Sequence, residues 1–284
     1  MKMDYITLLK EKYNYNYTFG NAEKQYNIFQ STFGIPDHNT VLLWEASKKG
    51  ELALVIEAFS NIKSSNIKEI AFERAVKWGH LDIVKYLVEN GIDIHTQNDQ
   101  ALKYACIHGR LEVVKYLIEN GADISKVYEN NMAVLIEVAN NGYLNVIKYL
   151  LEIINSTEYS EMILLTACVK GHLNMVKYLV EKGTNIHFLN EQSLWSACQQ
   201  GHLDIVKYLI EKGAVINDDM LECASSKGNL KIVKYLVERG ADVHANDEQT
   251  LKSAYAKGYM QTARYLVEQG ADISKVGSDL LNYL

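Results

Sequence analysis

The chain has one proline and no long apolar run, and both absences narrow its fold. Pro36 is the only proline in 284 residues, so nearly the whole chain is free to form helices. No apolar run approaches the roughly 18 residues that cross a bilayer, and the N-terminus (MKMDYITLLKEKYNYNYTF) lacks the apolar core of a signal peptide. We therefore expect a helical, intracellular protein that does not contact the membrane.

Positive charge is also scarce. Lys and Arg number 29 against 35 Asp and Glu, giving a net charge of −6. Proteins that bind the phosphate backbone instead gather excess Lys and Arg on one face. The charge balance therefore argues against nucleic acid as a partner.

Catalytic and redox signatures are missing as well. The sequence has no Gly-rich phosphate loop, nucleophile elbow or His-Glu-x-x-His motif. Three of its four cysteines share one position in a repeated pattern, and Cys223 lies two residues away from that position. Neighbouring helices lie about 8–10 Å apart, whereas a disulfide needs Cα atoms within about 7 Å. We expect reduced cysteines, no enzymatic activity, no metal and no cofactor.

The chain contains one sequence motif that is repeated at a nearly fixed interval. Successive anchoring glycines are 29, 30, 33, 29, 30, 27 and 30 residues apart. A period of this length indicates stacked repeats that each contact only their neighbours. The copies are GELALVIEAFSNI from Gly50, GHLDIVKYLVENG from Gly79, GRLEVVKYLIENG from Gly109, GYLNVIKYLLE from Gly142, GHLNMVKYLVEKG from Gly171, GHLDIVKYLIEKG from Gly201, GNLKIVKYLVERG from Gly228 and GYMQTARYLVEQG from Gly258.

Each copy predicts two helices around this turn glycine, from which we number the repeat. Apolar residues at −7 and −4 indicate a short inner helix, and those at +2, +4, +5, +8 and +9 indicate a longer outer helix. A second glycine, here called the stop glycine, follows at +12 in most copies and fits a left-handed helix end. One such unit buries too little apolar surface to fold alone, so each repeat needs neighbouring repeats to be stable.

The repeat register divides the chain into an N-terminal segment, residues 1–37, and a repeat array, residues 38–284. We expect the first segment to cap the array or to dock another protein, and residues 275–284 to form a C-terminal cap. The expected repeats are residues 38–65, 66–95, 96–125, 126–157, 158–187, 188–217, 218–244 and 245–274.

These residues resemble ankyrin repeats. The resemblance rests on the inner-helix Leu-x-x-Ala, the Gly-His turn, the Ile-Val-x-x-Leu outer helix and a Gly-Ala-Asp stop, as at Gly121-Ala122-Asp123. It implies an all-α ankyrin-repeat solenoid of about eight repeats. The family's Thr-Pro-Leu-His start is missing and the step is about 30 residues instead of 33, so we expect short, poorly formed β-hairpin loops. Such shortened repeats resemble those of giant DNA viruses.

The resemblance also implies a function. Ankyrin arrays bind other proteins, which predicts a non-catalytic interaction scaffold, here a monomer, that uses its concave face. The alternative is an adaptor that delivers a bound host protein to a ubiquitin-ligase or signalling complex through residues 1–37. If the source is viral, the host cytoplasm is the expected location.

Histidine and tyrosine recur at fixed repeat positions, which favours structural roles. Histidine follows the turn glycine in several copies, and His95, His187 and His244 sit where we expect a polar group that bonds the loop backbone. Tyrosine at +7 forms a column beside Lys at +6, with Glu at +10 one turn from those cations. We expect a solvated, neutralised back on the outer helices rather than a platform for bases.

Two segments break the pattern. Residues 1–40 are rich in Tyr and Phe and serve either as the cap or as the docking element. Between Gly121 and Asn155, three extra residues are expected to restore a full-length loop at residues 127–132, and the stop glycine is missing. A local change of curvature or a dedicated site would each explain this second irregularity.

The candidate binding surface consists of positions −2 and −1, which vary freely between copies while core positions do not. The family resemblance places this end of the inner helix in the concave groove. We expect Trp78 to be the strongest contact, because exposed Trp is enriched at interface hot spots, and expect Trp44 and Trp195 to be partly buried. The candidates are Lys77, Trp78, Ile107, His108, Asn140, Asn141, Val169, Lys170, Gln199, Gln200, Ser226, Lys227, Ala256 and Lys257. The expected surface also includes the loop tips Gln97, Asn98, Asp99, Asn190, Glu191, Asp247 and Glu248.

Overall fold

The computed structural model describes residues 38–155 and 158–276, without the side chains of Asn130 and Asn131. The chain forms two compact units, residues 1–93 and residues 94–284, which we call unit 1 and unit 2. The expected N-terminal cap and most of the expected C-terminal cap lie outside the described residues.

The repeated two-helix pattern is present throughout the described chain, and the described residues form no strand. Unit 1 contains α3 (His38–Lys49), α4 (Leu52–Phe59), α5 (Ser65–Trp78) and α6 (Leu81–Glu89). Unit 2 contains α7 (Thr96–Ile107), α8 (Leu111–Glu119), α9 (Ser125–Asn140), α10 (Leu144–Ile154), α11 (Ser160–Lys170), α12 (Leu173–Glu181), α13 (Phe188–Gln200), α14 (Leu203–Glu211), α15 (Asp218–Ser226), α16 (Leu230–Glu238), α17 (Ala245–Ala256), α18 (Met260–Glu268) and a 3-10 turn at Ile273–Lys275.

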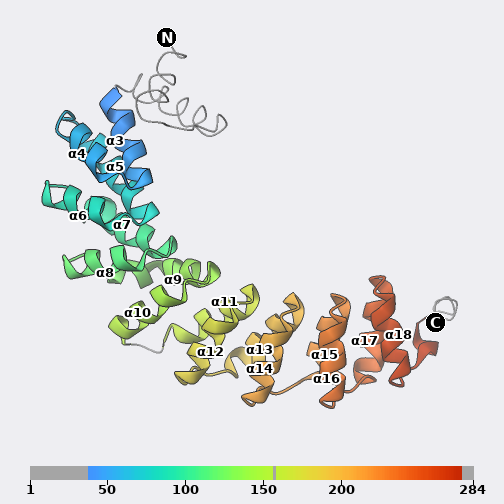
Figure 1. Ribbon diagram of the computed structural model, residues 1–284. Helices are drawn as coiled ribbons and strands as arrows, with labels where there is room; N and C mark the ends of the chain where they lie inside the picture. Colours follow the sequence, from blue (N-terminus) through green and yellow to red (C-terminus); the bar gives the residue numbers. More distant parts are fainter. Residues whose placement is uncertain (1–37, 156–157, 277–284) are drawn as a thin grey trace, which may run out of the picture. The chain divides into compact units, whose positions relative to one another are not determined.

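Odd-numbered helices are the inner helices and even-numbered helices the outer ones. In unit 2 each inner helix packs on its own outer helix and on the next inner helix, as α11 does on α12 and α13 (Figure 1). In unit 1, α3 packs on α4 and α5 in the same way. The predicted all-α architecture of stacked two-helix repeats is therefore confirmed over the described chain.

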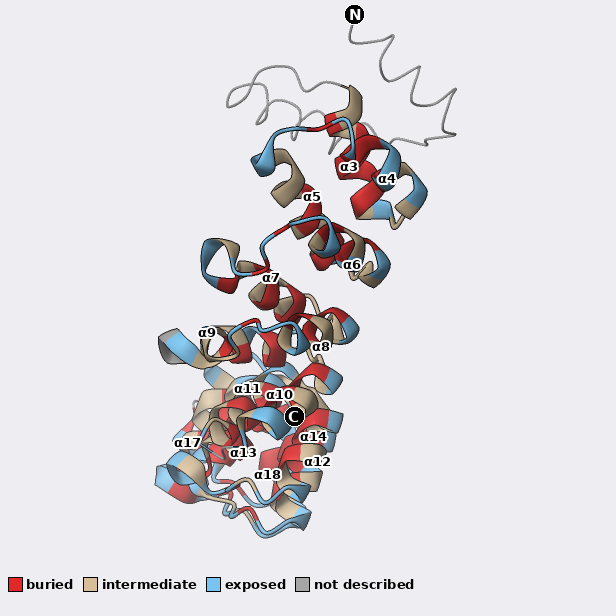
Figure 2. Cartoon of the chain, turned by 90° about the vertical axis from the view of Figure 1, so that its left-hand side faces the viewer, coloured by how far each residue is buried: buried red, intermediate tan, exposed pale blue. Residues whose placement is uncertain are grey.

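The core follows the repeat register. Every side chain at −4 is 0% exposed, and every side chain at −7 is at most 4% exposed. On the outer helices from α6 onward, positions +4, +5 and +8 are buried, as in Ile83, Val84 and Leu87, whereas +2 and +9 are half-buried at the edges of the helix. In α4, Leu54 at +4 is half-buried and Phe59 at +9 is buried. Buried residues therefore gather on the facing sides of paired helices (Figure 2).

The expected helix lengths were wrong. Inner helices span 9–16 residues, and α7, α13 and α17 each include three left-handed residues near their start, whereas the outer helices, expected to be longer, are 9 residues long in six of the eight repeats. The two glycines of a repeat cause this, because the turn glycine and the stop glycine leave room only for positions +2 to +10. The stop glycines have φ near +90 to +105°, as their role as helix ends requires.

The irregular repeat of residues 121–155 is helical where a loop was expected. Residues 127–132 lie within α9, the 16-residue inner helix, and Met132 has φ +61°. The outer helix α10 has 11 residues and ends at Asn155, whose φ of +48° places it in the left-handed region. Asn155 therefore replaces the missing stop glycine, which asparagine does more readily than other non-glycine residues.

Three connecting loops contain a short left-handed turn that the sequence does not reveal. In each, three consecutive non-glycine residues have φ between +48° and +64°. A left-handed residue with a Cβ costs roughly 1–2 kcal/mol, so each turn needs compensating contacts. The turns are Gln97-Asn98-Asp99, Leu189-Asn190-Glu191 and Asn246-Asp247-Glu248.

The compensation comes from a histidine four residues before the end of each turn. His95 Nδ1 lies 2.9 Å from Asp99 Oδ1, and the Asp99 amide donates to the His95 carbonyl. His244 pairs with Glu248 in the same way at 2.6 Å, and His187 pairs with Glu191. The expectation that these histidines bond the loop backbone was wrong, because their side chains bind carboxylates.

Lysine and tyrosine on the outer helices form a ladder between repeats of unit 2. The Lys at +6 of one repeat lies over the Tyr ring at +7 of the next, as Lys148 Nζ does 5.0 Å from the centre of Tyr178. The same contact recurs at Lys115–Tyr149, Lys177–Tyr208, Lys207–Tyr235 and Lys234–Tyr265, at 5.2 to 6.0 Å. The back of the outer helices is therefore linked by cation–π contacts, which sequence reasoning did not predict.

Candidate functional site

The candidate surface is built on the C-terminal ends of the inner helices, where each helix stops at the turn glycine. The side chain that follows this glycine, at +1, reaches back to the preceding repeat. His202 Nε2 lies 3.1 Å from the Val169 carbonyl, and His172 Nε2 lies 2.8 Å from the Asn140 carbonyl. Because a carbonyl only accepts, Nε2 carries the proton in both rings.

Histidine is not the only residue that makes this bridge. In unit 2, Asn229 at +1 donates to the Cys198 and Gln199 carbonyls at 2.9 and 3.2 Å. In unit 1, His80 donates to the Lys48 carbonyl at 2.9 Å. Sequence reasoning gave the +1 histidines a structural role but missed their partner; the signal was the recurrence of Gly-His itself.

The bridging ring also explains why the turn residue is glycine. Gly171 has φ +80°, and a Cβ on it would lie 2.6 Å from the His202 ring. Real Cβ contacts are not that short, and the φ value by itself disfavours any other residue. The turn glycine thus both ends its helix and makes room for the next repeat.

The 14 predicted binding residues all lie at this end of the inner helices, and none is buried. Residues at −2 are half-buried except Ala256, which is exposed, and residues at −1 are exposed except His108, which is half-buried. Lys77 and Trp78 belong to unit 1, and the other twelve belong to unit 2. The helix ends thus bring the predicted residues of unit 2 together as a series of neighbouring tips.

Several of these side chains bind their own helix. His108 Nδ1 donates to the Tyr104 carbonyl at 2.8 Å, and Ser226 Oγ donates to the Cys223 carbonyl at 2.9 Å. The Asn141 amide donates to the Ile107 carbonyl of the preceding repeat at 3.3 Å. These contacts fix part of the surface before any partner arrives.

The three tryptophans differ as expected. Trp78 is 51% exposed, and Lys48 Nζ lies 5.5 Å from its ring centre. Trp44 is buried and donates from Nε1 to the Ile67 carbonyl at 2.9 Å, whereas Trp195 is half-buried. Of the three, only Trp78 can offer a large apolar face to a partner.

The predicted loop-tip surface needs correction. Asp99, Glu191 and Glu248 are 5 to 6% exposed, because the left-handed turns bring their carboxylates beneath the paired histidines. Gln97, Asn98, Asn190 and Asp247 are exposed, as expected. These three carboxylates are buried, so the exposed part of the predicted loop-tip surface is smaller than expected.

The described residues offer little for chemistry. No group of three or more His, Cys, Asp or Glu side chains among them could hold a metal ion, and no helix among them is both long and apolar enough to cross a membrane. All four cysteines are free and buried, as predicted. Burial raises the pKa of the Cys168 thiol to about 12, so this thiol stays protonated and unreactive.

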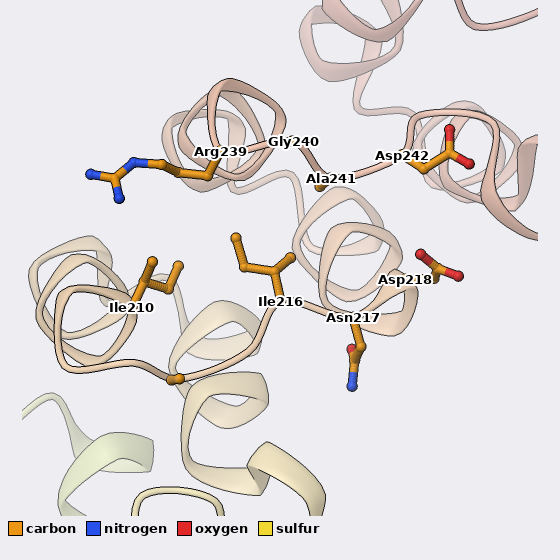
Figure 3. Close-up of a pocket in the computed structure, with 9 residues that line it drawn as sticks. Ile210, Ile216, Asn217, Asp218, Arg239, Gly240, Ala241 and Asp242 are labelled. Carbon is orange, nitrogen blue, oxygen red and sulfur yellow. The ribbon is translucent and has the colours of Figure 1, made fainter.

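A cavity of about 420 Å³ lies away from the inner-helix tips, beside two stop turns of unit 2 (Figure 3). Ile216 occupies its middle, and Arg239 extends away from Asp218 and Asp242 (Figure 3). The Arg239 guanidinium lies 4.8 Å over the Tyr235 ring, and Asp242 accepts from the His244 amide. The charged groups therefore do not converge on one ligand position. The cavity is lined by Ile210, Ala214, Ile216, Asn217, Asp218, Arg239, Gly240, Ala241 and Asp242.

Comparison with known proteins agrees with this architecture. The family model for ankyrin repeats, which describes three copies, matches residues 42–128, 102–190, 135–220 and 194–276. The chain belongs to the ankyrin repeat family. No curated protein matches it. Among solved structures, the human ASB11 ankyrin repeat domain matches with a TM-score of 0.61 and 24% identity, over 71% of this chain and 98% of that chain. At that identity the likeness concerns the fold alone.

Membership of the ankyrin family indicates a protein–protein interaction scaffold. Ankyrin repeats are generally non-catalytic. The array thus combines a regular core with a variable row of side chains at the inner-helix tips.

Proposed function

We propose that this ankyrin array is a non-catalytic scaffold that binds a partner protein through the tips of its inner helices. The observation that carries the proposal is the contrast between a uniform core and a variable tip. Position −4 is Ala in seven repeats and Val in one and is fully buried, whereas positions −2 and −1 hold Lys, Trp, Ile, His, Asn, Val, Gln, Ser and Ala. Packing does not explain this variety, because a packed slot favours side chains of one size.

Each unit offers exposed side chains suited to a protein contact, a large apolar ring in unit 1 and polar groups in unit 2. Trp78 in unit 1 is exposed, as are Lys170 and Gln200 in unit 2. Exposed Trp surrounded by polar groups is the usual composition of a binding hot spot. We propose that partners bury Trp78 when they bind.

The test is a triple variant, Trp78→Ala with Gln199→Ala and Gln200→Ala, compared with wild type in a pull-down followed by mass spectrometry. We expect at least one specific partner of wild type, with affinity for the variant about ten-fold or more weaker, since truncation of a hot-spot residue costs about 2 kcal/mol or more. The matched control truncates exposed side chains of the outer helices, Lys85→Ala with Glu181→Ala and Glu211→Ala. A folded triple variant that binds at full affinity would place the interface elsewhere.

An adaptor role is the second candidate, supported by the aromatic-rich segment of residues 1–37. In that case the segment carries the bound protein to a ubiquitin-ligase or signalling complex. The resemblance of the shortened repeats to those of giant DNA viruses supports a viral source, which would make both partners host proteins of the cytoplasm. Removal of residues 1–37 separates cap from adaptor, as argued in the Discussion.

A further inference from the structure

The inner-helix tips of unit 2 carry charge of one sign only. We define the tip row as positions −2 and −1 of the six repeats in this unit. Among these twelve side chains there are three lysines, one histidine and no acid, in a chain whose acids outnumber its bases. The tip row consists of Ile107, His108, Asn140, Asn141, Val169, Lys170, Gln199, Gln200, Ser226, Lys227, Ala256 and Lys257.

A preference of cations for the C-terminal end of a helix does not account for this segregation. The helix dipole favours bases in the last turn of every helix, inner or outer. Three outer helices of unit 2 also carry bases at their C-caps, Lys182, Lys212 and Arg239, yet all six outer helices of the unit carry an acid at +10, at Glu119, Glu152, Glu181, Glu211, Glu238 and Glu268. The dipole acts equally on both rows, so the exclusion of acids from the tip row has another cause.

The row also presents no carboxylate acceptor, although its amide and hydroxyl side chains accept as well as donate. The backbone carbonyls at −2 are already occupied: those of Asn140, Val169 and Gln199 accept from the +1 side chain of the next repeat. The Ile107 carbonyl accepts from Asn141. Among the side chains of the row, the lysine ammonium groups are therefore the only full charges apart from His108, and the amides add further N–H donors.

The lysines of the row are not committed to neighbours. Lys170, Lys227 and Lys257 are all exposed. Within the part of unit 2 that the structure describes, none of them forms an ion pair. Acids one turn back along the inner helices are engaged instead. Glu222 accepts from Gln249 and Ser253, and Glu137 accepts from the Asn140 amide.

From these observations, and resting on the proposed scaffold function, we propose that the partner presents an acidic, extended segment to the tip row of unit 2. Neighbouring repeats are about 10 Å apart, and an extended chain advances about 3.3 Å per residue. Lys227 and Lys257 are one repeat apart, and Lys170 and Lys227 are two repeats apart. The segment therefore carries carboxylates spaced about three and about six residues apart.

Nucleic acid is the other polyanion, and the charge distribution disfavours it. Three lysines neutralise few phosphates, and the chain is acidic overall, with a net charge of −6. The tip row of unit 2 also contains no Trp, Tyr or Phe on which bases stack. An acidic protein segment needs neither feature.

The test selects random twelve-residue peptides, displayed on phage, on the full-length protein. We expect enrichment of acidic peptides with the predicted spacing. We then measure the affinity of the best peptide by fluorescence anisotropy. It should bind about ten-fold more weakly to the variant in which Lys170, Lys227 and Lys257 are changed to Gln. Its affinity for wild type should fall as the salt concentration rises. The matched control changes Lys177, Lys207 and Lys234 of the outer helices to Gln, removes the same charge and should bind as wild type does. Circular dichroism verifies that both variants are folded.

Three results would overturn the inference. Enrichment of neutral or basic peptides would contradict an acidic partner while leaving the scaffold function intact. Lysine-dependent binding of a twelve-nucleotide RNA that is tighter than that of the best peptide would assign the row to nucleic acid. Failure to enrich any peptide would reject an extended acidic ligand, and the pull-down would still decide the scaffold function independently.

Discussion

At the scale of single residues, the bridge between repeats explains why Gly-His recurs. The ring at +1 donates to a carbonyl that would otherwise end its helix without a partner, and it packs on the preceding turn glycine. One side chain therefore stabilises both the helix end and the stacking of two repeats. Where the chain replaces His by Asn, Asn229 keeps the bond to the −2 carbonyl, that of Gln199, and adds one to the Cys198 carbonyl.

This geometry makes a prediction for His202. We expect His202→Ala to lower the free energy of unfolding by about 0.5–1.5 kcal/mol, because the Val169 carbonyl loses its donor. His202→Asn should recover most of that loss, since Asn229 makes the same bond in the next repeat. Urea unfolding monitored by circular dichroism measures both. Equal losses for the two variants would mean that the ring's packing, and not its hydrogen bond, holds the repeats together.

The buried carboxylates make a second prediction, on pH. The hydrogen bond from His244 to Glu248, followed by the attraction of the same carboxylate, raises the pKa of His244 above its usual 6.5. A raised pKa means that this contribution to stability is complete below about pH 6.5 and is lost as pH rises through the folded-state pKa. A histidine NMR titration of wild type should give a value above 6.5, and Glu248→Gln should return it toward 6.5. An unchanged pKa in Glu248→Gln would exclude Glu248 as the cause.

At the scale of elements, sequence periodicity predicted the helix pair but not the loops. The apolar steps at −7, −4, +4, +5 and +8 are all core positions, because helical spacing and burial leave a direct mark on residue type. The left-handed turns leave no such mark, since they contain no glycine, and Asp99 reads in the sequence as an exposed loop acid. Likewise, the spacing of Lys at +6 and Glu at +10 suggested ion pairs within one helix. In the structure the lysine instead lies over the Tyr ring of the next repeat. A single sequence does not show contacts across repeats.

The exposure of the candidate residues could be predicted better than the loops, whereas their role in binding stays a prediction. Residues that neither pack nor cap a helix vary between copies, so the exposed tips such as Trp78 and Gln200 could be identified from variation alone. What the sequence could not show is which tips are already held by hydrogen bonds, as His108 and Asn141 are. Those contacts depend on the side-chain geometry of the folded helix.

The cation–π ladder gives the prediction at this scale. The Tyr208 ring lies between Lys177 at 5.7 Å and Lys212 at 5.6 Å, and its buried hydroxyl has no partner among the described residues. Tyr208→Phe should therefore leave the free energy of unfolding within about 0.5 kcal/mol of wild type. Tyr208→Leu should cost about 1–2 kcal/mol, since it removes two cation–ring contacts. Urea titrations compare the two, and similar losses would show that the hydroxyl, rather than the ring, matters.

At the scale of the whole molecule, a repeat array is stabilised by each repeat and by the interface between neighbours. An interior inner helix such as α11 packs on both α9 and α13. Among the described elements of unit 1, α3 has an inner-helix neighbour on one side only, α5. A terminal repeat of this kind needs a polar cover to stay soluble. Residues 1–37 precede α3 directly in the sequence, and we propose that they supply this cover.

We therefore expect removal of residues 1–37 to reduce solubility and to lower the urea midpoint, because the end of the array loses its cover. Light scattering after size exclusion should give a monomer of 32.2 kDa for the full chain and larger, heterogeneous species for the truncated one. The control is a full-length chain in which only the exposed Lys63 and Ser64 are changed to Ala, which alters the surface of unit 1 without removing the segment. A truncated chain that stays monomeric and fully folded, yet loses one partner in the pull-down, would contradict the cap. It would instead assign residues 1–37 to docking, because removal of the segment would then affect binding and not folding.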